Sequence, residues 1–373
     1  MRRLLVTLLI VPAVSSAQAR PTTATIVHQV DSLANAFVAA GGTPSVAIAI
    51  TRGGNTIIMG AWGKSDLEQN VDATPESVYE LGSATKQFTA AAVMQLVDQG
   101  KVKLDEPIAT YLPALPEAWR VVTVHQLLNH TSGIPNYTAV PAWQIHWAEE
   151  KTPDSLIVFT TNLPMDFAPG TKYKYDNQGY ILLGMIIERV TGKHWEADLV
   201  ERFAKPLGLT STRICDAGSI IPHRVRGYQR LNDTVVNAPY FSVSQAFSAG
   251  AICSTVGDMA RWNLALHTGK VVSAASYRLM TTPEGPAAAS KYGFGLQIDT
   301  IAGHKLISHG GNIPGFASAN AWVAEEELSV TVLSNALTGN PGLLSRQVMR
   351  AALGLPPAVP PAAGRRPPGG SRQ

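Results

Sequence analysis

The sequence predicts an α+β fold: an antiparallel sheet flanked by N- and C-terminal helices, plus an inserted all-helical subdomain. The regions expected to build the sheet lie at both ends of the chain, at about 25–63 and 290–354. Helical patterns broken by many Pro and Gly turns fill the stretch from about 84 to 282. Strands and helices do not alternate regularly, as they would in a doubly wound parallel sheet. The sheet is therefore expected to assemble from the two ends of the chain.

The first part of the chain predicts a helix followed by a hairpin. Helical periodicity over Ile26–Ala40 places four apolar residues on one face: Ile26, Val30, Leu33 and Phe37. Gly41 and Gly42 then end this helix. The β-rich runs Ser45–Thr51 and Thr56–Trp62 follow, separated by a Gly53-Gly54-Asn55 turn signal.

The rest of the chain predicts helices in the middle and strands near the end. The expected helices are Ala84–Gln99, Gln178–Val190 and Val256–His267. The expected strands are Gly293–Ile298, His304–Ser308, Ala317–Val323 and Leu328–Leu333. A last helix over Pro341–Leu353 is expected to pack with the N-terminal helix on one face of the sheet.

The two ends are expected to lie outside the folded domain, which is assigned to residues 20–355. Residues 1–19 have the pattern of a cleavable signal peptide: Arg2 and Arg3, then the apolar run Leu4–Val14, then Ala17-Gln18-Ala19. We therefore expect a periplasmic or secreted protein. Residues 356–373 form a Pro/Gly/Arg tail that is expected to be disordered. No later run is long and apolar enough to predict a stable membrane span.

Composition argues against nucleic-acid binding and against a metal or other cofactor. The formal charge of +3 comes from five arginines at the two ends, without which it would be −2. Cys215 and Cys253 are the only cysteines; they lack metal-ligand spacing, and the sequence leaves open whether they form a disulfide. A zinc site from His125 and His130 is not supported by their spacing, so His130 is expected to be structural.

The run Ser83-Ala84-Thr85-Lys86 is the first candidate for chemistry. It lies directly before a predicted helix, where residues three apart share a face, so Lys86 can approach the Ser83 hydroxyl. The start of a helix also stabilises developing negative charge. The pattern is short, and a capping Ser with a surface Lys would explain it equally well.

The second candidate is Tyr175-Asp176-Asn177, in a loop that follows a Pro169-Gly170 turn. Tyr175 and Asn177, two residues apart in a loop, could project into one cleft. A phenol can act as a base where nearby cations lower its pKa, and an amide can hold a substrate acyl group. The alternative is a packed Tyr and an Asn that caps the next helix.

The third candidate is His309-Gly310-Gly311-Asn312, expected at the end of a strand. Glycines allow a substrate to approach the backbone closely. Such an edge strand could pair with a substrate and supply an N–H group to an oxyanion hole. A tight turn with a surface His is the alternative.

These three elements, in this order, resemble the class C β-lactamase-like serine hydrolases. That family includes D-Ala-D-Ala carboxypeptidases, D-amino-acid peptidases and amidases, and esterases. The resemblance also covers Leu127–Ile134, Pro206–Thr212 and Ser248–Met259, and it runs from about Ile26 to Leu353. It implies a β-lactamase/transpeptidase-like fold, with the active site in the crevice between the sheet and the helical subdomain.

The resemblance also implies roles for the residues of the three elements. Ser83 would attack a carbonyl group, with Lys86 and Tyr175 sharing the proton transfers. Lys86 and a protonated His309 would favour the Tyr175 phenolate. The N–H groups of Ser83 and Asn312 would hold the oxyanion, and Asn177 would position a small-molecule or peptide substrate.

Two departures from the family pattern bear on the substrate. Typical class C β-lactamases carry Lys where this chain has His309, and a permanent cation suits an anionic substrate. Asp176 is unusual between the Tyr and the Asn, and it would repel carboxylates if it faced the cleft. We therefore expect a hydrolase of esters or small amides. The alternatives are a D-amino-acid peptidase or carboxypeptidase, a true β-lactamase, and a sensor that is acylated but barely turns over.

Overall fold

A computed structural model describes residues 20–357 of the 373-residue chain. A seven-stranded sheet in the order β3-β2-β1-β12-β11-β10-β9 forms its centre, and all neighbouring strands are antiparallel. Its strands are β1 Ser45–Arg52, β2 Asn55–Asp66, β3 Val71–Asp72, β9 Gln297–Ile301, β10 His304–Ile313, β11 Phe316–Val323 and β12 Leu328–Ser334. The predicted assembly of this sheet from both ends of the chain is confirmed, because β1 pairs with β12.

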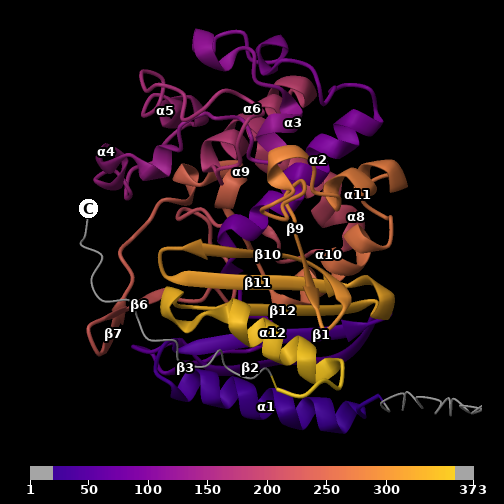
Figure 1. The fold of residues 1–373 in the computed structure, drawn as a ribbon. Helices are drawn as coiled ribbons and strands as arrows, with labels where there is room; N and C mark the ends of the chain where they lie inside the picture. Colours follow the sequence, from indigo (N-terminus) through magenta and orange to yellow (C-terminus); the bar gives the residue numbers. More distant parts are fainter. Residues whose placement is uncertain (1–19, 358–373) are drawn as a thin grey trace, which may run out of the picture.

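Helices α1 (Thr23–Ala39) and α12 (Pro341–Ala352) cover one face of the sheet side by side (Figure 1). The alternation of strand residues decides which side chains they meet. In β1, Val46, Ile48 and Ile50 pack against these two helices, whereas Ala47 and Ala49 face the opposite core. The predicted flanking of the sheet by the N- and C-terminal helices is therefore confirmed.

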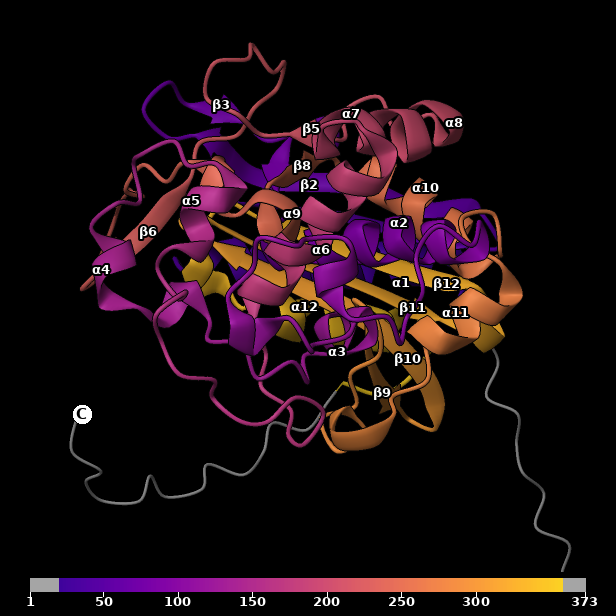
Figure 2. The same cartoon turned by 90° about the horizontal axis from the view of Figure 1, so that it is seen from above.

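The chain between the two halves of the sheet packs on the opposite face and is mainly helical. Helices α2, α6 and α9 lie together in front of the sheet when the molecule is seen from above (Figure 2). The helices of this region are α2 Lys86–Asp98, α3 Val124–Leu128, α4 Pro141–Gln144, α5 Pro153–Ile157, α6 Asn177–Thr191, α7 Trp195–Leu199, α8 Lys205–Leu207, α9 Phe247–Gly250, α10 Val256–His267 and α11 Ala274–Met280.

This inserted region also contains short strands that the sequence did not predict. Strands β4 (Tyr79–Glu80), β8 (Ile252–Ser254) and β5 (Arg213–Ile214) form one small antiparallel sheet. Strands β6 (Tyr228–Leu231) and β7 (Thr234–Asn237) form a hairpin. The small sheet matters for the site, because the backbone N–H of Leu81, just after β4, donates to the Ile252 carbonyl and so fixes the start of the segment that carries Ser83.

One predicted strand is displaced. The sequence favoured a strand over Gly293–Ile298, but β9 begins at Gln297. Gly293 and Gly295 are instead needed for close packing: a Cβ atom at Gly293 would lie 2.0 Å from the Met280 carbonyl oxygen, and one at Gly295 would lie 2.6 Å from that of Lys86. The backbone bends through these contacts before it can join the sheet.

Among residues 20–357, no helix is both long enough and apolar enough to cross a bilayer. The predicted signal peptide (residues 1–19) and almost all of the predicted tail lie outside the described residues.

Candidate active site

Ser83 lies on a short 3-10 helix, η1 (Gly82–Thr85), that leads directly into α2. The predicted helix from Ala84 therefore begins as a 3-10 turn, and its α-helical part begins at Lys86. The spacing of three residues still brings the two side chains together: Lys86 Nζ donates to Ser83 Oγ over 3.2 Å. The nucleophile candidate and its amine are thus in contact.

Lys86 is completely buried, and its amine has two further partners. Nζ donates to Asn177 Oδ1 over 2.8 Å and to the Ala249 carbonyl oxygen over 2.9 Å. Burial lowers the pKa of Lys86 to about 7, and the nearby Asp176 carboxylate limits this decrease. Near neutral pH a substantial fraction of this amine is therefore unprotonated and able to accept a proton.

Tyr175, Asp176 and Asn177 lie where the chain enters α6. Asn177 is the first residue of this helix, not a loop residue as the sequence suggested. Asp176 caps the helix, because its carboxylate accepts from the backbone N–H groups of Gln178 and Gly179 over 2.7 and 2.9 Å. Asp176 is therefore turned into the protein, and burial raises its pKa to about 7. We expected Asp176 to repel substrate carboxylates if its side chain faced the cleft. The side chain does not face the cleft, so this repulsion does not apply.

The Tyr175 ring packs between Lys86 and His130. Lys86 Nζ lies 4.9 Å from the centroid of the Tyr175 ring. The centroids of the Tyr175 and His130 rings lie 4.3 Å apart. Burial raises the pKa of the Tyr175 phenol well above its usual value, and the neighbouring Ser83 hydroxyl only partly opposes this. The prediction that neighbouring cations would favour a Tyr175 phenolate is therefore wrong, because burial has the larger effect and keeps the phenol protonated. Within the described residues, the Ser83 hydroxyl is the polar neighbour of this buried phenol, which has no other hydrogen-bond partner.

His309 is neutral in this environment. Burial and, to a smaller extent, the charge of Lys86 lower its pKa to about 4. Its Nδ1 lies 2.6 Å from the Gly310 carbonyl oxygen, which only accepts, so Nδ1 carries the proton. Nε2 then accepts from the Tyr292 hydroxyl, 2.9 Å away. Both ring nitrogens are therefore occupied, and His309 does not supply the cation that the sequence reasoning allowed.

The His309–Asn312 segment lies inside β10, which continues to Ile313 rather than ending before it. Strand β9 pairs with β10 only as far as Ser308, so the backbone from His309 onward is an open edge on that side. A Cβ atom at Gly311 would lie 1.9 Å from the Leu81 carbonyl oxygen and 2.7 Å from Ser83 N. A Cβ atom at Gly82 would lie 2.9 Å from Asn312 N. The glycines thus bring the N–H groups of Ser83 and Asn312 to one place, as an oxyanion hole requires.

Two pockets meet at Ser83 and Asn312. The first, here called the aromatic pocket, has a volume of about 270 Å³ and is walled by Tyr137, Trp143, Trp147 and Phe241. The second, here called the strand-edge pocket, has a volume of about 650 Å³ and follows β10 past His309, Gly310 and Gly311. Asn177 lines the aromatic pocket, whereas Tyr175 lines the strand-edge pocket. Seven of the eight residues predicted for the site therefore line these two pockets, and the eighth, Lys86, is buried and in contact with Ser83.

Sequence reasoning missed several residues that hold the site together. The Ala249 carbonyl oxygen accepts from Lys86, and Tyr292 donates to His309. Thr138 Oγ1 accepts from Asn177 Nδ2 over 3.2 Å, which fixes the side of the amide that faces Lys86. The Ser248-Ala249-Gly250 stretch was noted as part of the resemblance, but no pattern could show that a backbone carbonyl there would serve as an acceptor.

The remaining candidates have structural surroundings. His130, which was expected to be structural, is buried, and its Nδ1 accepts from the backbone N–H of Asp176 over 3.2 Å. Cys215 and Cys253 are both buried and free, which settles the question that the sequence left open. No cluster of His, Cys, Asp and Glu side chains suited to a metal ion occurs between residues 20 and 357.

Comparison with known proteins gives matches over most of the chain. The beta-lactamase family model matches residues 30–355. The D-aminopeptidase of Brucella canis is 28% identical over 327 residues, which are 85% of this chain and 61% of the relative. The chain thus spans about three fifths of the length of that protein.

Solved structures show the same similarity over nearly their whole length. The D-stereospecific amidohydrolase from a Streptomyces species superposes with a TM-score of 0.76 at 28% identity, covering 89% of this chain and 98% of that one. For the D-amino acid amidase from Ochrobactrum anthropi SV3 the TM-score is 0.78 at 25% identity, with 87% and 98% covered.

Proposed function

Because this chain belongs to the beta-lactamase family of serine hydrolases, we propose that it cleaves uncharged esters and small amides through an acyl-enzyme on Ser83. The observation that carries the choice of substrate is the absence of charged side chains from the walls of both pockets. Among the described residues, no Asp, Glu, Lys or Arg lines either pocket that reaches Ser83. A charged substrate group would lose its water there without gaining a counter-ion, which is costly.

The protonation states suggest how the proton is moved. The unprotonated Lys86 amine accepts the Ser83 proton while Ser83 Oγ forms its bond to the carbonyl carbon. The N–H groups of Ser83 and Asn312 stabilise the oxyanion. The protonated Tyr175 phenol donates to the leaving oxygen or nitrogen as its bond to the carbonyl carbon breaks. A water molecule then attacks the acyl carbon and gives its proton to the Tyr175 phenolate. As the bond from that carbon to Ser83 Oγ breaks, the Lys86 ammonium returns its proton to Oγ, so the acid product leaves and all three side chains regain their starting states.

This assignment predicts a pH dependence. Since the base must be unprotonated, kcat/KM is expected to rise with pH through an apparent pKa near 7, which belongs to the coupled Lys86–Asp176 pair, and then to level off. Asp176→Asn keeps a side chain able to cap α6 but removes the charge that raises the Lys86 pKa. The ascending limb should therefore move to lower pH.

A pH–rate profile of the Asp176→Asn variant checks this shift. Asp154→Asn, in the first turn of α5, is the control and should keep the wild-type profile. An ascending limb that stays at the same pH in Asp176→Asn would contradict the role of Lys86 as the base.

The substrate assignment is tested with matched esters. Phenyl acetate and 3-carboxyphenyl acetate differ only by a carboxylate remote from the reacting carbonyl group. The uncharged ester is expected to have a kcat/KM at least about tenfold higher, because the strand-edge pocket offers no cation. His309→Lys should narrow this difference. Comparable turnover of both esters by the wild type, or efficient hydrolysis of nitrocefin or a D-Ala-D-Ala peptide, would contradict the proposal.

A second candidate function is the hydrolysis of D-amino-acid amides, which the similarity to a D-aminopeptidase and a D-amino acid amidase favours. A free amino group would need a carboxylate. Glu80 lies in a separate cavity that shares Phe241 and Pro314 with the aromatic pocket, and burial raises the pKa of Glu80 to about 7. D-phenylalanine amide and its N-acetyl derivative separate the two functions, since only the second candidate requires the free amine.

We also propose that the protein is exported, on the basis of the signal-peptide pattern in residues 1–19. This stays a prediction, and the mass of the mature protein would check it.

A further inference from the structure

The aromatic pocket is walled by a segment with little regular structure of its own. Residues 141–151 contain only the four-residue helix α4, yet they contribute Trp143 and Trp147 to the pocket. The Trp143 ring packs on Tyr137 and on Trp147, with centroid separations of 5.3 and 5.7 Å. Phe241 packs on both tryptophans, at 6.2 and 5.9 Å. Four rings from three parts of the chain thus enclose one apolar space.

Gln245 holds this segment in place. Its side chain is completely buried at the end of the 3-10 helix η6 (Val243–Gln245). Its Nε2 donates to the carbonyl oxygens of His146 and of Glu149, the latter at 2.8 Å. Its Oε1 accepts from the indole Nε1 of Trp143 over 2.7 Å. One amide therefore satisfies two backbone carbonyls and one indole, which no apolar side chain of similar size could do.

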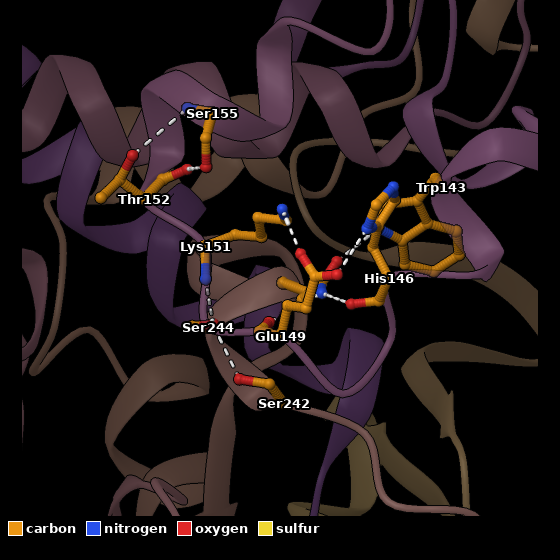
Figure 3. Close-up of polar contacts among 9 residues, drawn as sticks. Trp143, His146, Glu149, Lys151, Thr152, Ser155, Ser242 and Ser244 are labelled. Atoms are coloured by element: carbon orange, nitrogen blue, oxygen red, sulfur yellow. Dashed lines mark hydrogen bonds and ion pairs between the residues drawn. The ribbon is translucent and has the colours of Figure 1, made fainter.

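The backbone N–H of Ser242, which is buried, also donates to the Trp147 carbonyl oxygen over 2.8 Å, whereas the other side-chain contacts of the segment lie nearer to solvent. Glu149 Oε1 lies 2.6 Å from His146 Nδ1, and Glu149 Oε2 accepts from Lys151 Nζ over 2.6 Å; this carboxylate is half exposed (Figure 3). Ser244 Oγ accepts from the backbone N–H of Lys151 over 2.9 Å (Figure 3). Exposed ion pairs contribute little to stability. The Gln245 amide is therefore the buried side-chain contact that holds Trp143 and the backbone on both sides of Trp147.

The two pockets can be assigned to the two halves of a substrate. The group that protonates the leaving atom must lie on the leaving-group side, and Tyr175 lines only the strand-edge pocket. The hydroxyl of Tyr137, which lines the aromatic pocket, already donates to the Gln245 carbonyl oxygen, and this pocket reaches Ser83 from the side of Asn177. The acyl group therefore belongs in the aromatic pocket.

We propose that the aromatic pocket selects a flat, uncharged acyl group of about the size of phenylacetyl, and that Gln245 is the positioning residue that sets its shape. The proposal rests on the proposed function, since it assumes an acyl-enzyme on Ser83. Flat rings suit the pocket because its walls are rings that meet edge to face.

The test compares p-nitrophenyl phenylacetate with p-nitrophenyl acetate, which share a leaving group. After correction for uncatalysed reactivity, the wild type is expected to prefer phenylacetyl in kcat/KM by roughly tenfold or more. Trp147→Ala and Gln245→Leu should each bring this ratio toward one, through a higher KM for the phenylacetyl ester. A loss confined to kcat and equal for both esters would overturn the positioning role of Gln245.

Two control variants separate this effect from general damage. Ile145→Ala alters an exposed side chain of the same segment that does not line the pocket. Gln95→Leu removes another glutamine that bridges distant segments, by donating to Val271 O and accepting from Arg202, away from the site. Both should keep the wild-type ratio. If Gln245→Leu does not fold, Trp147→Ala, at a half-buried position, still decides the selectivity.

The outcomes also distinguish the selectivity of the aromatic pocket from the proposed hydrolase function. Failure of the wild type to hydrolyse either ester would refute the proposed function. Hydrolysis of both esters without a preference for phenylacetyl, or with a preference that Trp147→Ala leaves intact, would refute only the selectivity of the aromatic pocket.

Discussion

Replacing Ser83 with alanine is expected to lower kcat for the preferred ester by about 10⁴-fold or more, because among residues 20–357 no other hydroxyl is hydrogen-bonded to Lys86. The substitution removes one half-buried oxygen, so the melting temperature should stay close to that of the wild type. Mass spectrometry of the protein mixed with a slow ester should show a covalent acyl adduct on the wild type and none on the variant.

Ser219→Ala serves as the control, since Ser219 is exposed and lines neither pocket. It should retain full activity and full labelling. Turnover or acylation of Ser83→Ala near the wild-type level would remove Ser83 from the mechanism, whatever the substrate is.

Replacing Lys86 with methionine is expected to reduce kcat by about 10³-fold while KM changes little. Methionine keeps most of the buried stem of the side chain but removes the general base. It also leaves Asn177 Oδ1 and the Ala249 carbonyl oxygen without their donor, which costs about 1–3 kcal/mol for each buried group left unpaired. Steady-state kinetics together with the melting temperature separate the two effects.

An exposed lysine provides the comparison: Lys101→Met should be indistinguishable from the wild type in both measurements. A Lys86→Met protein that is folded and retains its ascending pH limb would show that another group accepts the Ser83 proton, with Tyr175 as the first alternative.

The sequence could predict the parts of the site that depend on local spacing. Ser83 and Lys86 meet because residues three apart on a helical turn share a face, and this needs no knowledge of the fold. The strands at both ends of the chain were also predictable from alternation and β-branched residues. The boundary of β9 was not, because Gly293 and Gly295 look like parts of a strand until their close contacts with Met280 and Lys86 are seen.

The protonation states of the site residues depend on burial, which residue spacing does not reveal. The Tyr175 pKa was reasoned from the cations that might surround it, yet desolvation dominates and keeps the phenol protonated. His309 was treated as a possible cation, although the Tyr292 hydroxyl and the Gly310 carbonyl oxygen occupy both of its nitrogens. Gln245 carried no signal at all, since a glutamine between apolar residues does not reveal which distant carbonyls it will meet.

The central pairing of β1 with β12 has a consequence for biosynthesis. β1 and β2 can form a hairpin early, but the other edge of β1 stays open until β12 has left the ribosome. During that time the apolar run Val46–Ile50 lacks both its pairing with β12 and its packing against α12. A fold in which the two ends of the chain pair with each other forms slowly. Until it forms, the unpaired edge of β1 can pair with other chains and cause aggregation. The nascent chain therefore depends on being shielded until its last strand arrives.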